Sequence, residues 1–218
     1  MTTEPTALYD LVDPRSIAES APYTFFLPNA AEMAAVGRGD LVKLTFEYPP
    51  PTEKWAAERM WVTVEQVGVE GIVGSLDNHP DEPTSKLKAG DLITFQRHHI
   101  LAIMWDNPAA APLPTDRRQY WERCIVDQCV LDGEEPVEFL WRDHPEPVSD
   151  GDRYPDSGWC IRGRAGDASL DELNARKKAY VALGAVLNRD DSWIAWIDAP
   201  VGTTLVRDFA TGRYIEEN

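Results

Sequence analysis

The sequence predicts an α+β protein of two small domains, each a strongly bent, mostly antiparallel sheet with one or two short helices. Three observations predict this class. Short alternations of apolar and polar residues, as in Leu41–Tyr48, are typical of strands with one wet face. Gly-Asp pairs at Gly39-Asp40 and Gly90-Asp91 are turns that lead into such strands. Residues 106–119 hold three prolines and three alanines without a period of two or 3.6, which indicates a linker.

These observations divide the 218 residues into four parts. Residues 1–20 form an N-terminal extension, and residues 21–105 form a small β-rich α+β domain. Residues 106–119 are the Pro/Ala linker, and residues 120–218 form a second α+β domain. Because the chain exceeds the usual size of one domain, two small domains agree with its length.

In the first domain, a strand is predicted over residues 23–27, followed by a helix. The helix begins with the capping-box spacing of Asn29 and Glu32, and Gly37 ends it. Further strands are predicted over residues 41–48, 60–67, 72–76 and 92–95. Short strands separated by Gly-Asp turns predict a small bent sheet or partial barrel with one helix.

In the second domain, strands are predicted at Cys124–Val126, at the alternating Val137, Phe139 and Trp141, and at Trp159–Ile161. The capping box of Ser169 and Glu172 begins a helix.

Toward the C-terminus, residues 180–187 fit a helix and a strand equally. Asp191 is expected to cap a short helix over residues 193–197. A loop over residues 198–202 leads to a closing strand over 203–206.

The charge of the chain is strongly acidic. Asp and Glu number 37 against 21 Lys and Arg, which gives a formal net charge of −16 and a pI near 4.6. Such a surface repels phosphate backbones and anionic lipid, so we expect neither nucleic acid nor membrane as a partner. It would attract a basic protein, although solubility alone also explains the acidity.

No apolar run is long enough to cross a bilayer, and the first residues lack a signal-peptide pattern. The three cysteines, Cys124, Cys129 and Cys160, are too few for a disulfide framework. We therefore expect a cytoplasmic protein.

The residues that could carry chemistry form no recognisable site. His98 and His99 are neighbours, and Cys124 and Cys129 are five apart, so in strands each pair would point to opposite faces. No nucleophile, zinc-protease, phosphate-binding or dinucleotide-binding motif occurs. We expect no cofactor, no metal and no catalysis, with an unrecognised hydrolase as the distant alternative.

The best candidate for a partner-binding surface is the acidic segment over residues 132–156. Arg142 and Arg153 are the basic residues among its acidic ones. A solvated loop and a contact for a basic partner are the two alternatives for this segment. The candidate partner-binding residues are Glu134, Glu135, Glu138, Asp143, Glu146, Asp150, Asp152 and Asp156.

Three stretches of the second domain carry a resemblance to a known family. They are Cys124–Val126, Asp156-Ser157-Gly158-Trp159 and Asp198-Ala199-Pro200-Val201-Gly202-Thr203. In this order they resemble the polymorphic-toxin immunity family called immunity protein thirty-three, formerly domain of unknown function twenty-one eighty-five. From the residues themselves, Gly158 and Trp159 are first a turn and a core anchor, and Pro200 and Gly202 a fixed turn.

The first domain resembles a separate family, domain of unknown function twenty-three fourteen, over about residues 39–105. The matching residues are Glu58–Val62 around Trp61, Gly74–Pro80, and Leu87–Asp91 with Gly90 and Asp91. That resemblance implies a fold and no activity.

The resemblance of the second domain implies an immunity-like protein that binds and neutralises a cognate toxin, expected to be basic. The alternative is a general cytosolic binding or regulatory protein with no toxin partner, whose acidity serves solubility.

Overall fold

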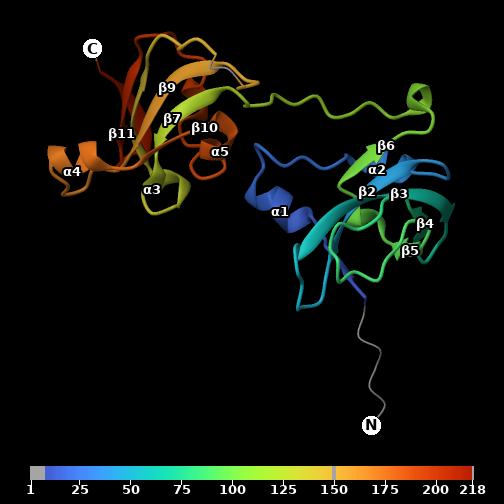
Figure 1. Ribbon diagram of the computed structural model, residues 1–218. Helices are drawn as coiled ribbons and strands as arrows, with labels where there is room; N and C mark the ends of the chain where they lie inside the picture. The colour runs from blue at the N-terminus through green and yellow to red at the C-terminus, as the bar shows by residue number, and fades with distance from the viewer. Residues whose placement is uncertain (1–7, 149–150, 218) are drawn as a thin grey trace. The chain divides into compact units, whose positions relative to one another are not determined.

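A computed structural model describes residues 8–148 and 151–217 and divides the chain into two compact units (Figure 1). The first unit contains the chain up to Ser20 together with Phe25–Arg117, and the second contains Ala21–Thr24 together with Arg118–Asn218. Each unit has its own hydrophobic core and its own six-stranded sheet with a few short helices. The α+β class predicted from the sequence is confirmed.

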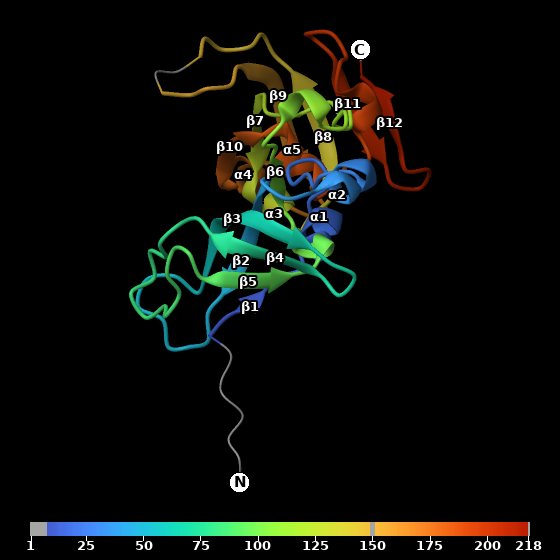
Figure 2. The same ribbon diagram turned by 90° about the vertical axis from the view of Figure 1, so that its right-hand side faces the viewer.

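The sheet of the first unit is antiparallel, and most of its strands follow chain order. That order is β1 (Asp10–Leu11), β2 (Leu41–Glu47), β3 (Ala57–Val67), β4 (Ile72–Leu76) and β5 (Leu92–Phe95). Strand β6 (Ala102–Met104) also pairs with β2, opposite its first residues. Figure 2 shows β2 to β5 as neighbouring arrows of this curled sheet. The helical elements are α1 (Arg15–Ser20), α2 (Ala30–Ala35), η1 (Arg97–His99) and η2 (Pro108–Ala110).

The alternation in β2 determines which side of this sheet is buried. Val42, Leu44 and Phe46 are fully buried, whereas Lys43 and Thr45 between them are half-exposed. Burying three large apolar side chains stabilises the unit by several kcal/mol, at about 1.5–3 kcal/mol each.

The two Gly-Asp pairs form the same turn. The Asp40 carboxylate accepts a hydrogen bond from the Gly37 N–H (2.9 Å), and the Asp91 carboxylate accepts one from the Lys88 N–H (2.8 Å). Gly39 and Gly90 have φ values of 97° and 92°, a region that favours glycine. Each turn leads directly into a strand, as the sequence predicts.

The strand predicted over residues 23–27 is wrong. Ala21–Thr24 turns and belongs to the second unit, where the Tyr23 N–H donates to the Asn188 side-chain oxygen (2.9 Å). The Tyr23 hydroxyl also donates to the Asp191 carboxylate (2.6 Å). Tyr23 therefore forms hydrogen bonds to side chains of the second unit, in place of main-chain hydrogen bonds to a neighbouring strand.

The sheet of the second unit is mixed. Its order is β10 (Lys178–Ala182), β7 (Arg123–Asp127), β9 (Asp156–Gly163), β8 (Val137–Arg142), β11 (Thr204–Asp208) and β12 (Arg213–Glu216). Strands β7 and β9 are parallel, and the other neighbours are antiparallel. The helical elements are α3 (Gln128–Leu131), α4 (Leu170–Ala175), α5 (Leu183–Leu187) and η3 (Ile194–Trp196).

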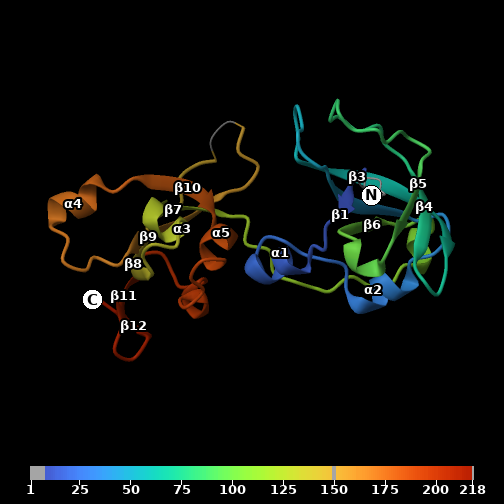
Figure 3. The same cartoon turned by 90° about the horizontal axis from the view of Figure 1, so that it is seen from below.

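One side of this sheet is covered by α3 and α5 and forms the core. Figure 3 shows α5 beside β7 and β10, which it contacts. The buried core residues include Val126, Leu140, Trp159, Ile161, Leu205, Leu183, Val186 and Trp193. We call the opposite side of the sheet the outer sheet face.

A β-bulge corrects the prediction for β8. The pairing with β9 shifts between Val137 and Phe139, so Val137 and Leu140 are buried, whereas Phe139 and Trp141 are half-exposed. The bulge adds one residue to the strand and reverses the alternation after it. Phe139 and Trp141 therefore lie on the outer sheet face, opposite to Val137.

The C-terminal part contains elements whose type or bounds the sequence did not decide. The ambiguous residues 180–187 finish a strand at Ala182 and continue as helix α5. Asp191 contributes its main-chain oxygen, which accepts from the Ile194 N–H (3.0 Å), and its side chain does not cap η3. The closing strand runs to Asp208 and pairs with β12, which the sequence did not predict.

Within the described residues, none of the helices has both the length and the apolar composition to cross a bilayer.

Candidate partner-binding site

The predicted acidic segment is divided between the two ends of β8. Glu134 and Glu135 precede the strand, and a second group follows it. Six residues of extended strand place these ends about 17 Å apart. The second group, which we call the acidic group, is Asp143, Glu146, Asp152 and Asp156. The remaining candidate, Asp150, lies outside the described residues.

Glu138 lies between these two groups and has a structural role. Its carboxylate accepts a hydrogen bond from the Ala165 N–H (2.6 Å) and so ties β8 to the chain that follows β9. A carboxylate bound in this way is less available to a partner.

Two members of the acidic group are held in place by hydrogen bonds and an ion pair. Asp156 accepts from the Glu146 N–H (2.9 Å), and Asp152 forms an ion pair with Arg123 (3.2 Å). The Tyr154 N–H also donates to Asp152 and, with Arg123, holds the pKa of its carboxyl below the usual value. Asp152 therefore stays ionised at neutral pH, and hydrogen bonds hold Asp152 and Asp156 in place.

Arg142, which the sequence suggested as a counter-charge to the acidic segment, instead joins two loops. Its guanidinium donates to the main-chain oxygens of Ser157 (3.0 Å) and Ala199 (2.5 Å). It also lies over the Trp159 ring, 5.6 Å from the centroid. The two motifs Asp156–Trp159 and Asp198–Thr203 therefore meet at one junction.

Glycine and tryptophan have specific roles at this junction. Gly158 has a φ of 78°, and a Cβ there would lie 2.1 Å from the Asp143 main-chain oxygen. The Trp159 indole donates to the Ile197 oxygen (3.1 Å) and is 1% exposed, so this ring packs the core and cannot contact a partner.

The other motif residues also shape the backbone. The Pro200 oxygen accepts from the Thr203 N–H (3.2 Å), and Gly202 has a φ of 93°, so this segment is a tight turn. In the first unit, the main-chain N–H of Trp61 donates to the side-chain oxygen of Asn78 (2.8 Å). The ammonium group of Lys43 lies over the Trp61 ring, 4.4 Å from its centroid.

A row of apolar side chains crosses four strands on the outer sheet face. The register pairs Tyr180 with Ile125, Ile125 with Cys160, and Cys160 with Trp141. Residues paired in this way point to the same side of a sheet. Tyr180 is 49% exposed and Ile125 41% exposed, whereas Cys160 and Trp141 are half-buried.

A second row continues the apolar surface toward the sheet edge. Phe139 pairs with Val206, which pairs with Ile215. The Phe139 and Trp141 rings also contact, with centroids 5.5 Å apart. On its other side Phe139 pairs with Arg162, so the second row is apolar from Phe139 to Ile215 and basic at Arg162. The open side of a sheet is usually polar, so these apolar side chains are a departure from the ordinary pattern.

The acidic group borders this apolar surface. The Trp141 indole donates to the Asp143 carboxylate (2.8 Å). Burial, and then the nearby charges of Asp143 and Asp156, raise the pKa of the Cys160 thiol to about 11. Burial and the same Asp156 charge raise the pKa of Tyr180. The outer sheet face is therefore apolar at its centre and negative along one side. Its opposite end holds the basic residues Lys178 and Arg162, which pair in register with Asp127 and Phe139.

A buried ion-pair network lies at the far end of the same strands. Asp127 is fully buried, and its carboxylate accepts from Arg162 (2.9 Å) and lies 3.6 Å from Arg176. Arg162 also donates to the main-chain oxygen of Leu173 in α4. The sequence did not indicate this network, because a single Asp after an apolar run is a common strand ending.

The cysteines and histidines form no reactive arrangement. Burial raises the pKa of the Cys124 and Cys129 thiols, and a protonated thiol is a weak nucleophile. Cys129 lies in α3, and His98 and His99 lie in η1, so neither pair is in one strand as the sequence argument assumed. Over residues 8–148 and 151–217 there is no cluster of three metal-ligand side chains.

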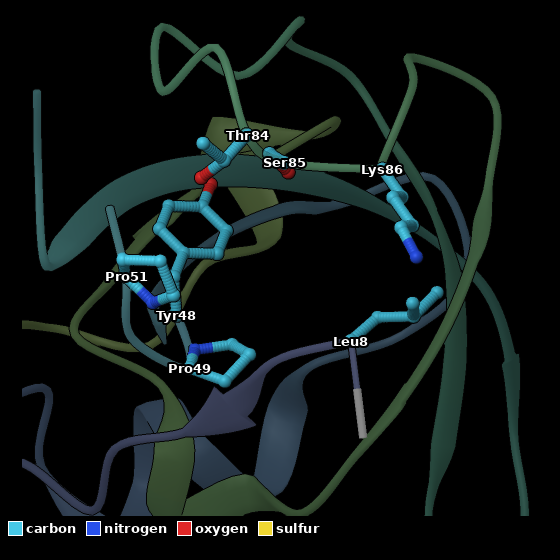
Figure 4. Close-up of a pocket in the computed structure, with 7 residues that line it drawn as sticks. All are labelled: Leu8, Tyr48, Pro49, Pro51, Thr84, Ser85 and Lys86. Atoms are coloured by element: carbon cyan, nitrogen blue, oxygen red, sulfur yellow. The ribbon is translucent and has the colours of Figure 1, made fainter. Parts of the chain in front are cut away.

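The first unit has a cavity of about 280 Å³ (Figure 4). The Tyr48 hydroxyl beside it donates to Glu58 (2.8 Å). Lys86 is the one charged residue of its lining, which has no paired acid and base for catalysis. The lining residues are Leu8, Tyr48, Pro49, Pro51, Thr84, Ser85 and Lys86.

Comparison with known proteins gives one match. No curated protein and no solved structure matches the chain. A family model described as "Immunity protein Imm33 domain" matches residues 124–217. The match begins in β7 and ends after β12, so it includes the whole six-stranded sheet of the second unit except Arg123, the first residue of β7. The second unit is therefore similar to immunity protein domains, as its motifs predicted.

Proposed function

We propose that this protein is an immunity protein that neutralises a cognate toxin by stoichiometric binding through its second unit. The observation that carries the proposal is the match of the immunity protein domain to residues 124–217. That range contains the apolar outer sheet face and the acidic group that borders it.

Charge supports a basic toxin as the partner. The chain has a formal net charge of −16, and an opposite charge on the partner would speed the encounter by long-range attraction. Neutralisation by binding needs no catalytic group, which agrees with thiols kept protonated by burial.

Growth of a bacterial host tests this proposal. Each gene adjacent to that of this protein is expressed alone and together with it. We expect at least one neighbouring product to stop growth alone, to be harmless together with this protein, and to form a 1:1 complex by light scattering. Harmless neighbours, or protection without a complex, would contradict the proposal and favour a general binding protein.

A further inference from the structure

We propose that the outer sheet face of the second unit docks a basic protein partner, with Tyr180, Ile125 and Trp141 at the centre of the contact. The identity of that partner as a toxin rests on the proposed function. The surface itself is argued from the register, the exposure and the charges of the second sheet.

The first argument is the apolar character of the face. Tyr180, Ile125, Cys160 and Trp141 are consecutive across four strands, and Phe139 extends the surface in the next row. An exposed apolar patch bordered by polar residues marks an interaction site in soluble proteins. The core of a protein interface has this composition, with aromatic residues at its centre and charge at its rim.

The second argument is that the central side chains are already ordered. The Trp141 indole is held by Asp143 (2.8 Å) and by the neighbouring Phe139 ring. Tyr180 and Ile125 are β-strand residues with fixed register. Anchors ordered before binding lose little conformational entropy on association, so they contribute more to affinity.

The third argument selects the partner. Asp143, Asp152 and Asp156 lie along one side of the face, where they affect the ionisation of Cys160 and Tyr180. Arg123 neutralises Asp152 in part, which leaves the side negative. The formal net charge of −16 on each chain opposes the association of two copies. A partner with a basic rim around an apolar patch fits the face.

Titration calorimetry with the purified toxin from the growth assay tests the inference. Ile125→Lys and Tyr180→Lys place a positive charge in the apolar centre, opposite a basic partner. Loss of a central anchor weakens binding by about 30-fold or more. Val69→Lys is the matched control, because Val69 is fully exposed in the first unit and the change in net charge is the same.

Two further variants keep the result interpretable. Tyr180→Ala removes the ring without adding charge, and a thermal melt of each variant shows that the fold is retained. Asp143→Asn removes one rim charge while its amide oxygen can still accept from Trp141. We expect Asp143→Asn to slow association at low salt and to have no effect at high salt.

The outcomes separate the inference from the proposed function. The inference is confirmed if the wild-type chain binds, Val69→Lys binds as wild type does, and Ile125→Lys and Tyr180→Lys bind about 30-fold more weakly or not at all. Folded variants that bind as wild type does overturn the face and leave the immunity function standing. A wild-type chain that binds no neighbouring product overturns both. Sedimentation showing a wild-type dimer that Tyr180→Lys dissociates assigns the face to a second copy and overturns the basic partner.

Discussion

The two sheets of this protein have similar cores and different outer surfaces. In the first sheet, the register places Leu41, Thr63, Ser75 and Leu92 in one cross-strand row, so two polar side chains separate two apolar ones. In the second sheet, the corresponding kind of row is Tyr180, Ile125, Cys160 and Trp141, with no polar interruption. The fold requires one buried side of each sheet and leaves the other side open to function. The apolar row is what distinguishes the second sheet, and it is the reason we propose that this sheet binds a partner.

The two units also hold their buried carboxylates differently. Glu82 in the first unit accepts main-chain N–H groups, including those of Lys54 and Trp55 (both 2.7 Å). Asp127 in the second unit is held by Arg162 and Arg176. Glu82 thus orders a loop, whereas Asp127 joins the end of the sheet to the chain around α4.

The largest expected effect compares the two sides of the second sheet. Trp159→Ala removes a fully buried ring and its bond to Ile197, which should lower the free energy of unfolding by about 3–5 kcal/mol. Trp141→Ala on the outer sheet face should cost about 1 kcal/mol, because its ring is half-exposed. Urea unfolding of both variants measures the difference. Equal losses would show that the outer sheet face is part of the core.

The next effect compares one glycine from each unit. Gly158→Ala places a Cβ against the Asp143 main-chain oxygen at a positive φ, and we expect a cost of about 2–4 kcal/mol. Gly90→Ala has a similar φ but open space around the new Cβ, and should cost about 1–2 kcal/mol. Thermal denaturation of the two variants provides the comparison. A larger loss for Gly90→Ala would contradict the close contact at the junction in the second unit.

The smallest expected effect is the loss, in acid, of the order that Glu82 gives to a loop of the first unit. Hydrogen bonds from Thr84 and from main-chain N–H groups outweigh burial and hold the pKa of Glu82 below its ordinary value of 4.5. A lowered folded-state pKa contributes stability that is complete above 4.5 and is lost as the pH falls from there toward the folded-state value. We expect the amide protection factors of residues 53–55 to decrease below pH 4.5.

Hydrogen exchange with correction for intrinsic rates measures this change. Glu82→Gln should lower the protection of residues 53–55 already at pH 7 and remove its dependence on acid. Amides of β7 provide the internal comparison, because Glu82 belongs to the other unit. Unchanged protection of residues 53–55 from pH 7 to pH 3 would show that Glu82 does not order this loop.

Local patterns predicted much of this fold. Strands β4 and β5 have the predicted bounds, since alternation and glycine turns are local signals, and both capping boxes form. The outer sheet face could not be predicted, because Ile125 lies in an apolar run and its neighbours come from distant strands. The bulge after Val137 changes which side chains face outward and also leaves no local signal.

The acidic segment illustrates the limit of composition. Its charges lie within 25 residues of sequence, over 132–156, yet β8 separates Glu134 from the acidic group. Nearness in sequence therefore suggested one large acidic surface, whereas the structure has two separate acidic groups. The apolar row beside the acidic group became visible with the strand order.

The indole N–H signals of the tryptophans test the central claim most directly. Trp61 lies on the outer side of the first sheet, Trp141 on the outer sheet face of the second, and Trp159 in the second core. Each signal is assigned by substitution in ¹⁵N-labelled protein, and the toxin from the growth assay is then added. We predict that the Trp141 signal shifts or broadens most, while those of Trp61 and Trp159 change little. An unchanged Trp141 signal in a complex that shifts Trp61 would place the contact on the first unit and contradict the account.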